Sequence, residues 1–254
     1  MLGMSRRIRL DRMLVERGLV ASRERAQALI LAGKVLVNGQ KVEKAGAEVD
    51  PAAEVLLLGE DLKYVSRGGV KLERALDHWR IDVRGQACMD VGASTGGFTD
   101  CLLQHGAARV IAIDTGYGQI ALKLREDARV RLLERTNARY LKPEDTGELV
   151  DFVAIDVSFI SATLVLPAVV RAARGGEHRR LDVVVLVKPQ FEAGRDAIGK
   201  GGIVRDSEVQ LATVEKVRRV LTELGASSTD VIESPIRGAE GNREFLLHGV
   251  FQDL

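Results

Sequence analysis

The sequence predicts an α/β protein: a mostly parallel sheet with an antiparallel last strand, preceded by a small amino-terminal α+β domain. From residue 87 onward, apolar runs alternate with amphipathic segments, which is typical of a parallel sheet covered on both faces. Two β-like runs near the end, 228–233 and 244–250, have no helix between them, so their short connection requires them to be antiparallel. Residues 1–58 follow another pattern, with two short helices and then a hairpin.

Composition and charge narrow the class of protein. The chain has 254 residues, enough for one large or two modest domains, and its 46% hydrophobic and 29% charged residues are ordinary for a soluble protein. The net charge is +1, but residues 1–44 contain ten Lys/Arg against four Asp/Glu. This basic segment indicates either a polyanionic partner or a solvated basic face. Two cysteines, Cys88 and Cys101, cannot form a disulfide framework or a metal cluster, and we expect buried thiols.

Membrane and secretory classes are disfavoured. No apolar run approaches the ~20 residues that span a bilayer. The first residues, Met1 to Arg7, lack the apolar core of a secretory signal. We therefore expect a cytoplasmic protein without a membrane partner.

The first domain begins with two amphipathic helices. Apolar residues at helical spacing predict a helix over 10–17 that ends at Gly18, and Ser22 is a good N-cap for a second helix over 23–31. Asn38-Gly39 between β-forming residues predicts a hairpin of strands 34–37 and 40–42. A further strand over 54–58 completes the unit.

This order, with RLDRMLVERGLVASRERAQALILAGKVLVNGQKV at its centre, resembles the S4 RNA-binding domain over about residues 8–66. The resemblance implies docking on structured RNA by shape and phosphate contact, in agreement with the local charge. The cations that we expect to contact RNA are Arg6, Arg7, Arg12, Arg23, Arg25, Lys34 and Lys41, with Arg67, Arg195 and Lys200 in the rest of the chain. A helical cap without an RNA role is the structural alternative.

The polar, glycine-containing stretch 59–70 predicts a linker, and we place the domains at 1–66 and 67–254. In the second domain the predicted strands are 87–91, 109–113, 130–133, 151–155, 182–187, 228–233 and 244–250. The predicted helices are 71–78, 97–104, 118–125, 160–172 and 206–223. This outline resembles that of the Rossmann-like methyltransferases.

A glycine-rich turn follows the first strand of this sheet, in Cys88-Met-Asp-Val-Gly-Ala-Ser-Thr-Gly-Gly-Phe98. Its spacing fails both G-x-G-x-x-G and the phosphate-binding G-x-x-x-x-G-K-[ST]. Asp114 ends the next strand, where an acid typically binds ribose hydroxyls. A glycine loop and a ribose acid without a phosphate-binding lysine favour S-adenosylmethionine (SAM). We expect its methionine part at Asp90, Gly92, Ser94, Thr95, Gly96 and Gly97, its ribose at Asp114 and its adenine at Asn137.

Ligands of such sheets bind beyond the carboxyl ends of the strands. Asp156 ends the fourth strand, within Asp-Val-Ser-Phe rather than the [ND]-P-P-[YFW] of base-amino methyltransferases, which disfavours amino methylation. Lys188 ends the fifth strand, and Glu244 begins the last one at the same edge because that strand runs antiparallel. Lys71 opens the helix before the sheet.

These four residues match, in order and context, the Lys-Asp-Lys-Glu tetrad of FtsJ-like ribose 2′-O-methyltransferases. With the S4-like domain and the motifs V-S-R-G-G-x-K-L, D-V-G-A-S-T-G-G-F-T-D, D-V-S-F-I-S and V-K-P-Q-F-E, nearly the whole chain resembles the TlyA family. The resemblance implies SAM-dependent methylation of cytidine 2′-hydroxyls in ribosomal RNA (rRNA), 16S and/or 23S, with ribosomal subunits as partners. We expect no metal to be required. Some members carry the label haemolysin.

The chemistry of the residues agrees with that expectation. Desolvation and the like charge of Lys71 would favour a neutral Lys188 amine, which could remove the hydroxyl proton. Asp156 would hold the lysines and polarise the hydroxyl, and Glu244 would balance the charge. The glycine-rich loop 194–205 is either a lid over RNA or a plain connector.

Three alternatives remain open: an RNA-binding or assembly factor without turnover, a membrane-active haemolysin, and a small-molecule O-methyltransferase. The haemolysin alternative lacks an amphipathic or spanning segment, and the small-molecule alternative leaves the S4-like domain without a purpose. The nucleotide, the ribosomal subunit and the oligomeric state do not follow from the sequence.

Overall fold

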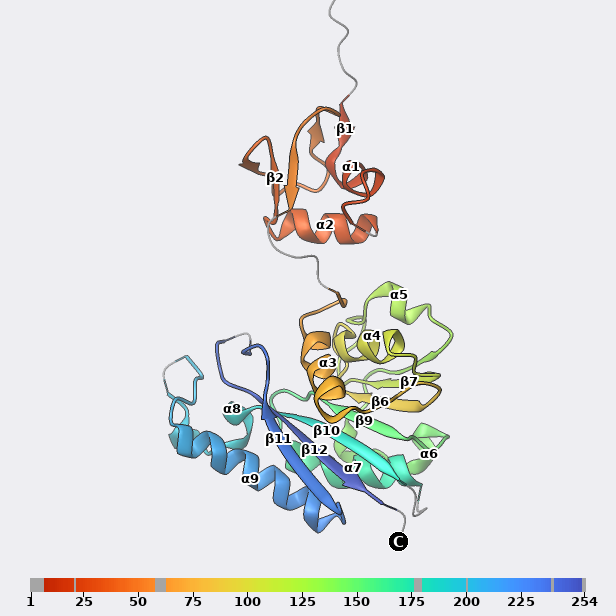
Figure 1. Cartoon of the computed structure of the whole chain (residues 1–254), viewed down its shortest axis with the longest axis vertical. Helices are drawn as coiled ribbons and strands as arrows, with labels where there is room; N and C mark the ends of the chain where they lie inside the picture. The colour runs from red at the N-terminus through yellow and green to blue at the C-terminus, as the bar shows by residue number, and fades with distance from the viewer. Residues whose placement is uncertain are drawn as a thin grey trace, which may run out of the picture. The chain divides into compact units, whose positions relative to one another are not determined.

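The computed structural model describes residues 7–20, 22–57, 63–175, 180–199, 201–238 and 240–252. The chain divides into two compact units, Met1–Leu62 and Lys63–Leu254 (Figure 1). The division falls inside the stretch predicted as a linker.

The first unit packs two helices on short strands. The helices are α1 (Leu10–Glu16) and α2 (Arg23–Leu31), and the strands are β1 (Ile8–Arg9), β2 (Val35–Val37), β3 (Gln40–Lys41), β4 (Glu48–Val49) and β5 (Val55–Leu57). The order β3-β2-β5 includes the predicted hairpin, whose turn residues Asn38 and Gly39 both have positive φ. The β1–β4 pair was not predicted, since two-residue strands show no alternation.

The second unit is built on a seven-stranded sheet of order β11-β12-β10-β9-β6-β7-β8. Its strands are β6 (Ala87–Val91), β7 (Arg109–Ile113), β8 (Val130–Leu133), β9 (Phe152–Ile155), β10 (Leu181–Val187), β11 (Ser228–Glu233) and β12 (Phe245–Phe251). Only β12 runs against the others, between β10 and β11. This topology confirms the predicted fold class.

Helices cover both faces of this sheet (Figure 1). One face carries α3 (Gly68–Trp79), α4 (Gly97–Gln104) and α5 (Leu122–Arg125), and the other carries α7 (Ala162–Arg174) and α9 (Ser207–Glu223). Short connections contain η1 (Ala138–Tyr140), α6 (Pro143–Thr146), α8 (Pro189–Glu192) and η2 (Arg195–Ala197). The helix predicted over 118–125 begins only at Leu122, because Gly118 has φ +70° and the preceding residues form turns.

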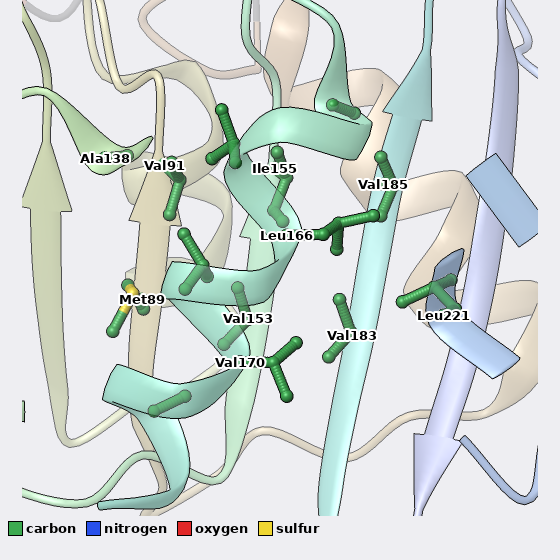
Figure 2. Packing of buried hydrophobic residues seen from close by; sticks show 14 of the residues in the cluster. Met89, Val91, Ala138, Val153, Ile155, Leu166, Val170, Val183, Val185 and Leu221 are labelled. Carbon is green, nitrogen blue, oxygen red and sulfur yellow. The ribbon is translucent and has the colours of Figure 1, made fainter. Parts of the chain in front are cut away.

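The core explains the apolar runs of the central strands. Figure 2 shows Val183 and Val185 of β10 beneath Leu166 and Val170 of α7. The intervening Val184 packs in the core of the opposite face, as strand alternation requires. Burial on both faces fixes the register of the sheet, so the residues that follow β6, β9 and β10 meet at one edge. None of the described helices combines the length and apolar character needed to cross a membrane.

Candidate active site

Two cavities lie at the carboxyl edge of the sheet in the second unit. The larger has a volume of about 640 Å³ and the smaller about 490 Å³, both within the ~300–1,000 Å³ of small-molecule sites. They share Gly92, Ser94, Asp156, Ser158 and Phe159 in their walls. These shared residues place the two cavities side by side, as two compartments of one site.

The larger cavity brings the four predicted catalytic residues together as two ion pairs. Lys71 Nζ lies 2.5 Å from Glu244 Oε2, and these side chains are only 11% and 3% exposed. Lys188 Nζ lies 2.6 Å from Asp156 Oδ1, a close ion pair outside hydrogen-bond geometry. Two cations and two carboxylates leave this group of four near neutrality, which suits a site that must exclude water.

The elements that carry these residues differ slightly from the prediction. Lys71 lies in the first turn of α3, which begins at Gly68 rather than at Lys71 itself. Glu244 immediately precedes β12. Asp156 and Lys188 directly follow the parallel neighbours β9 and β10, and this adjacency explains why their side chains meet.

Ser158 was missed as a site residue from sequence. Lys188 Nζ donates a 2.8 Å hydrogen bond to Ser158 Oγ, and Ser158 lines both cavities. The signal was present in the Asp-Val-Ser-Phe stretch, where a small hydroxyl residue stands two positions after Asp156. Its bond gives the lysine a second fixed partner.

Asn242 is a second residue that sequence reasoning missed. The residue is 1% exposed, and its side chain accepts from the backbone N–H of Val204 at 3.0 Å and donates to the carbonyl of Gly202 at 2.9 Å. It thus ties the described part of the 194–205 loop to the segment that presents Glu244. Ile198 and Gly202 place this loop in the wall of the larger cavity.

The glycine loop between β6 and α4 approaches the catalytic edge closely. Gly92 has φ +89°, and a Cβ there would collide with the backbone carbonyl of Asp156. Gly97 begins α4, and a Cβ there would meet Ser66 Oγ. Ser94 and Thr95 are exposed between them, and both line the larger cavity, whereas Gly96 is buried and lines neither. The loop therefore presents its backbone to the site.

Asp90 lies beneath this loop and lines neither cavity. It is fully buried, and its Oδ2 accepts bonds from Thr99 N at 2.8 Å and Thr99 Oγ1 at 2.6 Å. Burial, with smaller contributions from Asp156 and Asp114, raises the pKa of Asp90 to about 7, against the opposing effect of the Thr99 bonds. Its Oδ1 has no partner among the described residues. The predicted contact with a methionine group stays a prediction; the contacts present hold the start of α4.

Asp114 and Asn137 line the smaller cavity. Asp114 accepts the backbone N–H of Ser94 at 2.8 Å and that of Gly116 at 2.6 Å, so its carboxylate is fixed beside the glycine loop. Asn137 Oδ1 accepts the N–H of Arg139 at 3.0 Å. The oxygen of Asn137 is thus engaged within the chain, and its amide nitrogen is the group that could donate to a ligand.

These features fit a nucleoside cofactor in the smaller compartment. Asp114 offers carboxylate lone pairs to ribose hydroxyls, and Asn137 offers a donor to a base edge. Gly92 leaves room for close approach at the boundary with the larger cavity, where the ion pairs lie. A small molecule held across both compartments would present its far end to Lys188 and Asp156.

Two aromatic rings stand in the wall of the larger cavity. Phe159 is 92% exposed and has φ +64°, a strained conformation for a bulky residue. Its ring centroid lies 5.1 Å from that of Phe191. An exposed aromatic side chain on a strained backbone, beside the ion pairs, is a candidate ligand contact that sequence reasoning did not assign.

The predicted RNA-contacting cations lie in both units. In the second unit Arg67 is exposed and lines the larger cavity. Of the predicted cations in the first unit, Arg25 is half-buried, and the exposed ones are Arg7, Arg12, Arg23, Lys34 and Lys41. Arg6, Lys200 and the side chain of Arg195 lie outside the described residues.

A buried carboxylate organises two of the arginines in the first unit. Asp11 is 0% exposed and accepts bonds from Arg9, Arg23 and Gln27 at 2.8–3.0 Å. The Arg9 hydrogen bond is the largest effect that holds the pKa of Asp11 well below its ordinary value, against the cost of burial. Arg9 was missed from sequence.

Both units match known protein families. Residues 64–251 match the model of the FtsJ-like methyltransferases, and residues 8–55 match that of the S4 domain. A Mycobacterium tuberculosis protein named 16S/23S rRNA (cytidine-2′-O)-methyltransferase TlyA is 49% identical over 245 residues, which cover 96% of this chain and 90% of the relative. Brachyspira hyodysenteriae Hemolysin A is 40% identical over 242 residues, 95% of this chain and 99% of the relative. A solved structure from Streptococcus thermophilus has 44% identity and a TM-score of 0.71, covering 98% of this chain and 90% of that one.

Proposed function

Because the chain belongs to the TlyA family of FtsJ-like methyltransferases, we propose that it uses SAM to methylate the ribose 2′-hydroxyl of a cytidine in rRNA. The observation that supports this best is the meeting of Lys71, Glu244, Lys188 and Asp156 in one cavity, next to the glycine loop. An rRNA substrate would place the protein in the cytoplasm, in contact with ribosomal subunits.

The cofactor, when bound, supplies an electrophilic methyl group on a sulfonium. Asp114, Asn137, Ser94 and the backbone around Gly92 would hold it in the smaller compartment. The bond between Asp90 and Thr99 would fix the first turn of α4 beside the glycine loop. Holding the methyl group and the ribose oxygen in near-attack geometry is worth several orders of magnitude in rate, on the order of 7–11 kcal/mol for well-oriented groups.

Lys188 is the proposed base. A ribose hydroxyl is a weak acid, so its proton must leave as the oxygen attacks. Asp156 and Ser158 fix the lysine amine, and transfer of its proton to solvent before the reaction would leave a neutral amine able to accept the ribose proton. Lys71 and Glu244 would form the fixed, charge-balanced side of the cavity.

The target nucleotide would enter through the larger cavity. A base turned out of an RNA stack loses its neighbours, and an aromatic face compensates for that loss. Phe159 offers such a face beside the ion pairs. Arg67 at the cavity wall and the cations of the S4 domain would contact phosphates.

The decisive experiment incubates tritiated SAM with unmodified 30S and 50S subunits and either wild type or Lys188→Ala. We expect label in ribose with the wild type and a loss of at least about 100-fold with the variant, in line with removal of a general base. SAM affinity should stay within a few-fold, because the cofactor compartment is intact.

Lys123→Ala is the matched control. Lys123 also forms an ion pair with an aspartate, Asp100 at 3.0 Å, but it lines neither cavity. It should retain wild-type transfer. No transfer to either subunit by the wild type, with RNA binding intact, would contradict methylation and support a binding or assembly factor instead. No described feature favours a membrane-active haemolysin.

A further inference from the structure

Glu192 is a buried carboxylate that the proposed reaction does not use. Its side chain is 2% exposed, and it ends α8, four positions after Lys188. A carboxylate removed from water is costly unless its oxygens are bonded and its charge is compensated. Its partners therefore indicate what it is there to hold.

The partners of Glu192 lie at the end of the segment that begins with Asp156. Ser161 Oγ donates to Glu192 Oε2 at 2.5 Å, and the N–H of Ala162 donates to Oε1 at 2.6 Å. Ser161 is also the N-cap of α7, so Glu192 adds a negative charge at the start of a thirteen-residue helix.

α9 holds Glu192 from the other side. Lys216 Nζ donates to the backbone carbonyl of Glu192 at 2.9 Å and lies 3.4 Å from its Oε2. The carboxylate thus joins α7, α8 and α9 at a single point and is compensated by one cation and a helix start.

The segments that follow β9 and β10 are therefore linked to each other at both of their ends. Residues 156–161 follow β9 and residues 188–192 follow β10. At the strand ends they are joined by Lys188 with Asp156 and Ser158, and at the far ends by Glu192 with Ser161. The Phe159–Phe191 ring contact lies between these two links.

We infer that Glu192 is a positioning residue, which fixes the two segments against each other so that Lys188 meets Asp156 and Phe159 faces the larger cavity. This inference rests on the proposed function, since it assigns Glu192 a part in the geometry of that same reaction. Glu192 itself lines neither cavity. Its effect would pass through Lys188 and Phe159.

This role should affect the rate of methyl transfer more strongly than cofactor binding. The polar groups proposed to bind the cofactor come from the loops after β7, β8 and β6 and are those of Asp114, Asn137 and Ser94. Within the described structure Glu192 forms no hydrogen bond with these loops. Residues 156–160, which Glu192 helps to fix, also line this compartment. Displacement of Lys188 by about 1 Å can cost on the order of 100-fold in rate. Loss of Glu192 should therefore lower the rate of methyl transfer by a larger factor than it weakens SAM binding.

The test measures single-turnover methyl transfer to ribosomal subunits, the Kd for SAM by calorimetry and the thermal midpoint of each protein. For Glu192→Ala we expect a rate about 10–100-fold lower with a Kd within a few-fold of wild type. Glu192→Gln can accept from Ala162 and donate to Ser161, so it should restore the rate to within a few-fold. Lys216→Met should give a smaller loss of rate, again with a Kd for SAM within a few-fold of wild type.

Asp182→Asn is the control for a purely structural effect. Asp182 is a buried carboxylate at the other end of β10, paired with His248 at 2.8 Å and far along the strand from Lys188. It should lower the thermal midpoint and keep the rate of the folded protein. If Glu192→Ala does not fold, the methyl-transfer rate of Lys216→Met still tests the role of Glu192.

Two results would overturn the inference: a Glu192→Ala rate within about threefold of wild type, or parallel losses of rate and SAM affinity. If Glu192→Ala does not fold, a Lys216→Met variant that transfers methyl groups at the wild-type rate would also overturn the inference. Wild type that transfers no methyl group would instead contradict the proposed function and, with it, the role of Glu192. The wild-type reaction thus distinguishes the two failures.

Discussion

Lys71 and Lys188 line the same cavity, yet their surroundings differ. Both lysine side chains are 11% exposed, but the glutamate paired with Lys71 is only 3% exposed. Lys188 is paired with Asp156, which is 21% exposed and whose carbonyl touches the glycine loop. A lysine that must lose and regain a proton needs access to water or substrate, whereas a fixed charge does not. This difference favours Lys188 as the base and Lys71 as the constant cation.

The buried carboxyl group of Asp90 should make the free energy of unfolding depend on pH. Its pKa is about 7 in the folded protein against 3.8 in the reference state, so the native state binds one more proton between these values. The free energy of unfolding should therefore fall as the pH rises from about 4 through 7, by an amount on the order of a few kcal/mol. Asp90→Asn mimics the protonated acid and should remove this fall.

The measurement is denaturant unfolding of both proteins at pH 5 and pH 8, without cofactor. The other carboxyl groups are common to the two proteins, so the difference between their pH dependences isolates Asp90. Equal pH dependences would show that Asp90 ionises normally in the folded state.

The loop between β6 and α4 leaves no room for a side chain at Gly92, which lies against the backbone of Asp156. Gly92→Ala places a methyl group against the Asp156 carbonyl at a positive φ, so the loop or the catalytic segment must move. We expect at least a tenfold loss of SAM affinity, about 1.4 kcal/mol or more, together with a loss of methyl transfer.

Gly85→Ala is the control for backbone strain alone. Gly85 has φ +71°, but a Cβ there would meet nothing within 4 Å. It should lose stability, by about 1 kcal/mol, and keep SAM affinity. An unchanged SAM affinity in Gly92→Ala would mean that the loop adapts and that close approach is not required.

Much of this arrangement could be predicted because it follows from local pattern. The central strands are apolar runs, and their direction places Asp156, Lys188 and Glu244 at one edge. What could not be predicted depends on distant contacts: that Lys71 pairs with Glu244, and that Glu192 bonds Ser161. The short elements η1, α6 and α8 were missed because three or four residues show no periodicity.

For the whole molecule, the two units should contribute separately to activity. In the first unit Asp11 holds Arg9 and Arg23, which are 47% and 52% exposed, in fixed positions. Asp11→Ala should free these arginines and weaken subunit binding about tenfold, with SAM affinity unchanged, since fixed cations bind phosphates at a lower entropic cost. The measurement compares the Kd for subunits and for SAM across salt concentrations.

Glu16→Gln serves as the control for this prediction. Glu16 is an exposed carboxylate on the same helix, paired with Arg12 at 2.7 Å, and such pairs contribute little. It should leave subunit binding near wild type. If Asp11→Ala binds subunits as tightly as wild type, the first unit does not depend on ordered arginines for RNA affinity.

The position of β12 also governs when activity can arise as the chain is made. Glu244 lies 173 residues after its partner Lys71, and β12 must enter between β10 and β11 to bring the two together. A chain synthesised only as far as α9 holds β10 with one side unpaired, and its seven buried residues form an edge open to other strands. The same late event closes that edge and completes the ion pair, so protection from aggregation and catalytic competence are acquired in one step of biosynthesis.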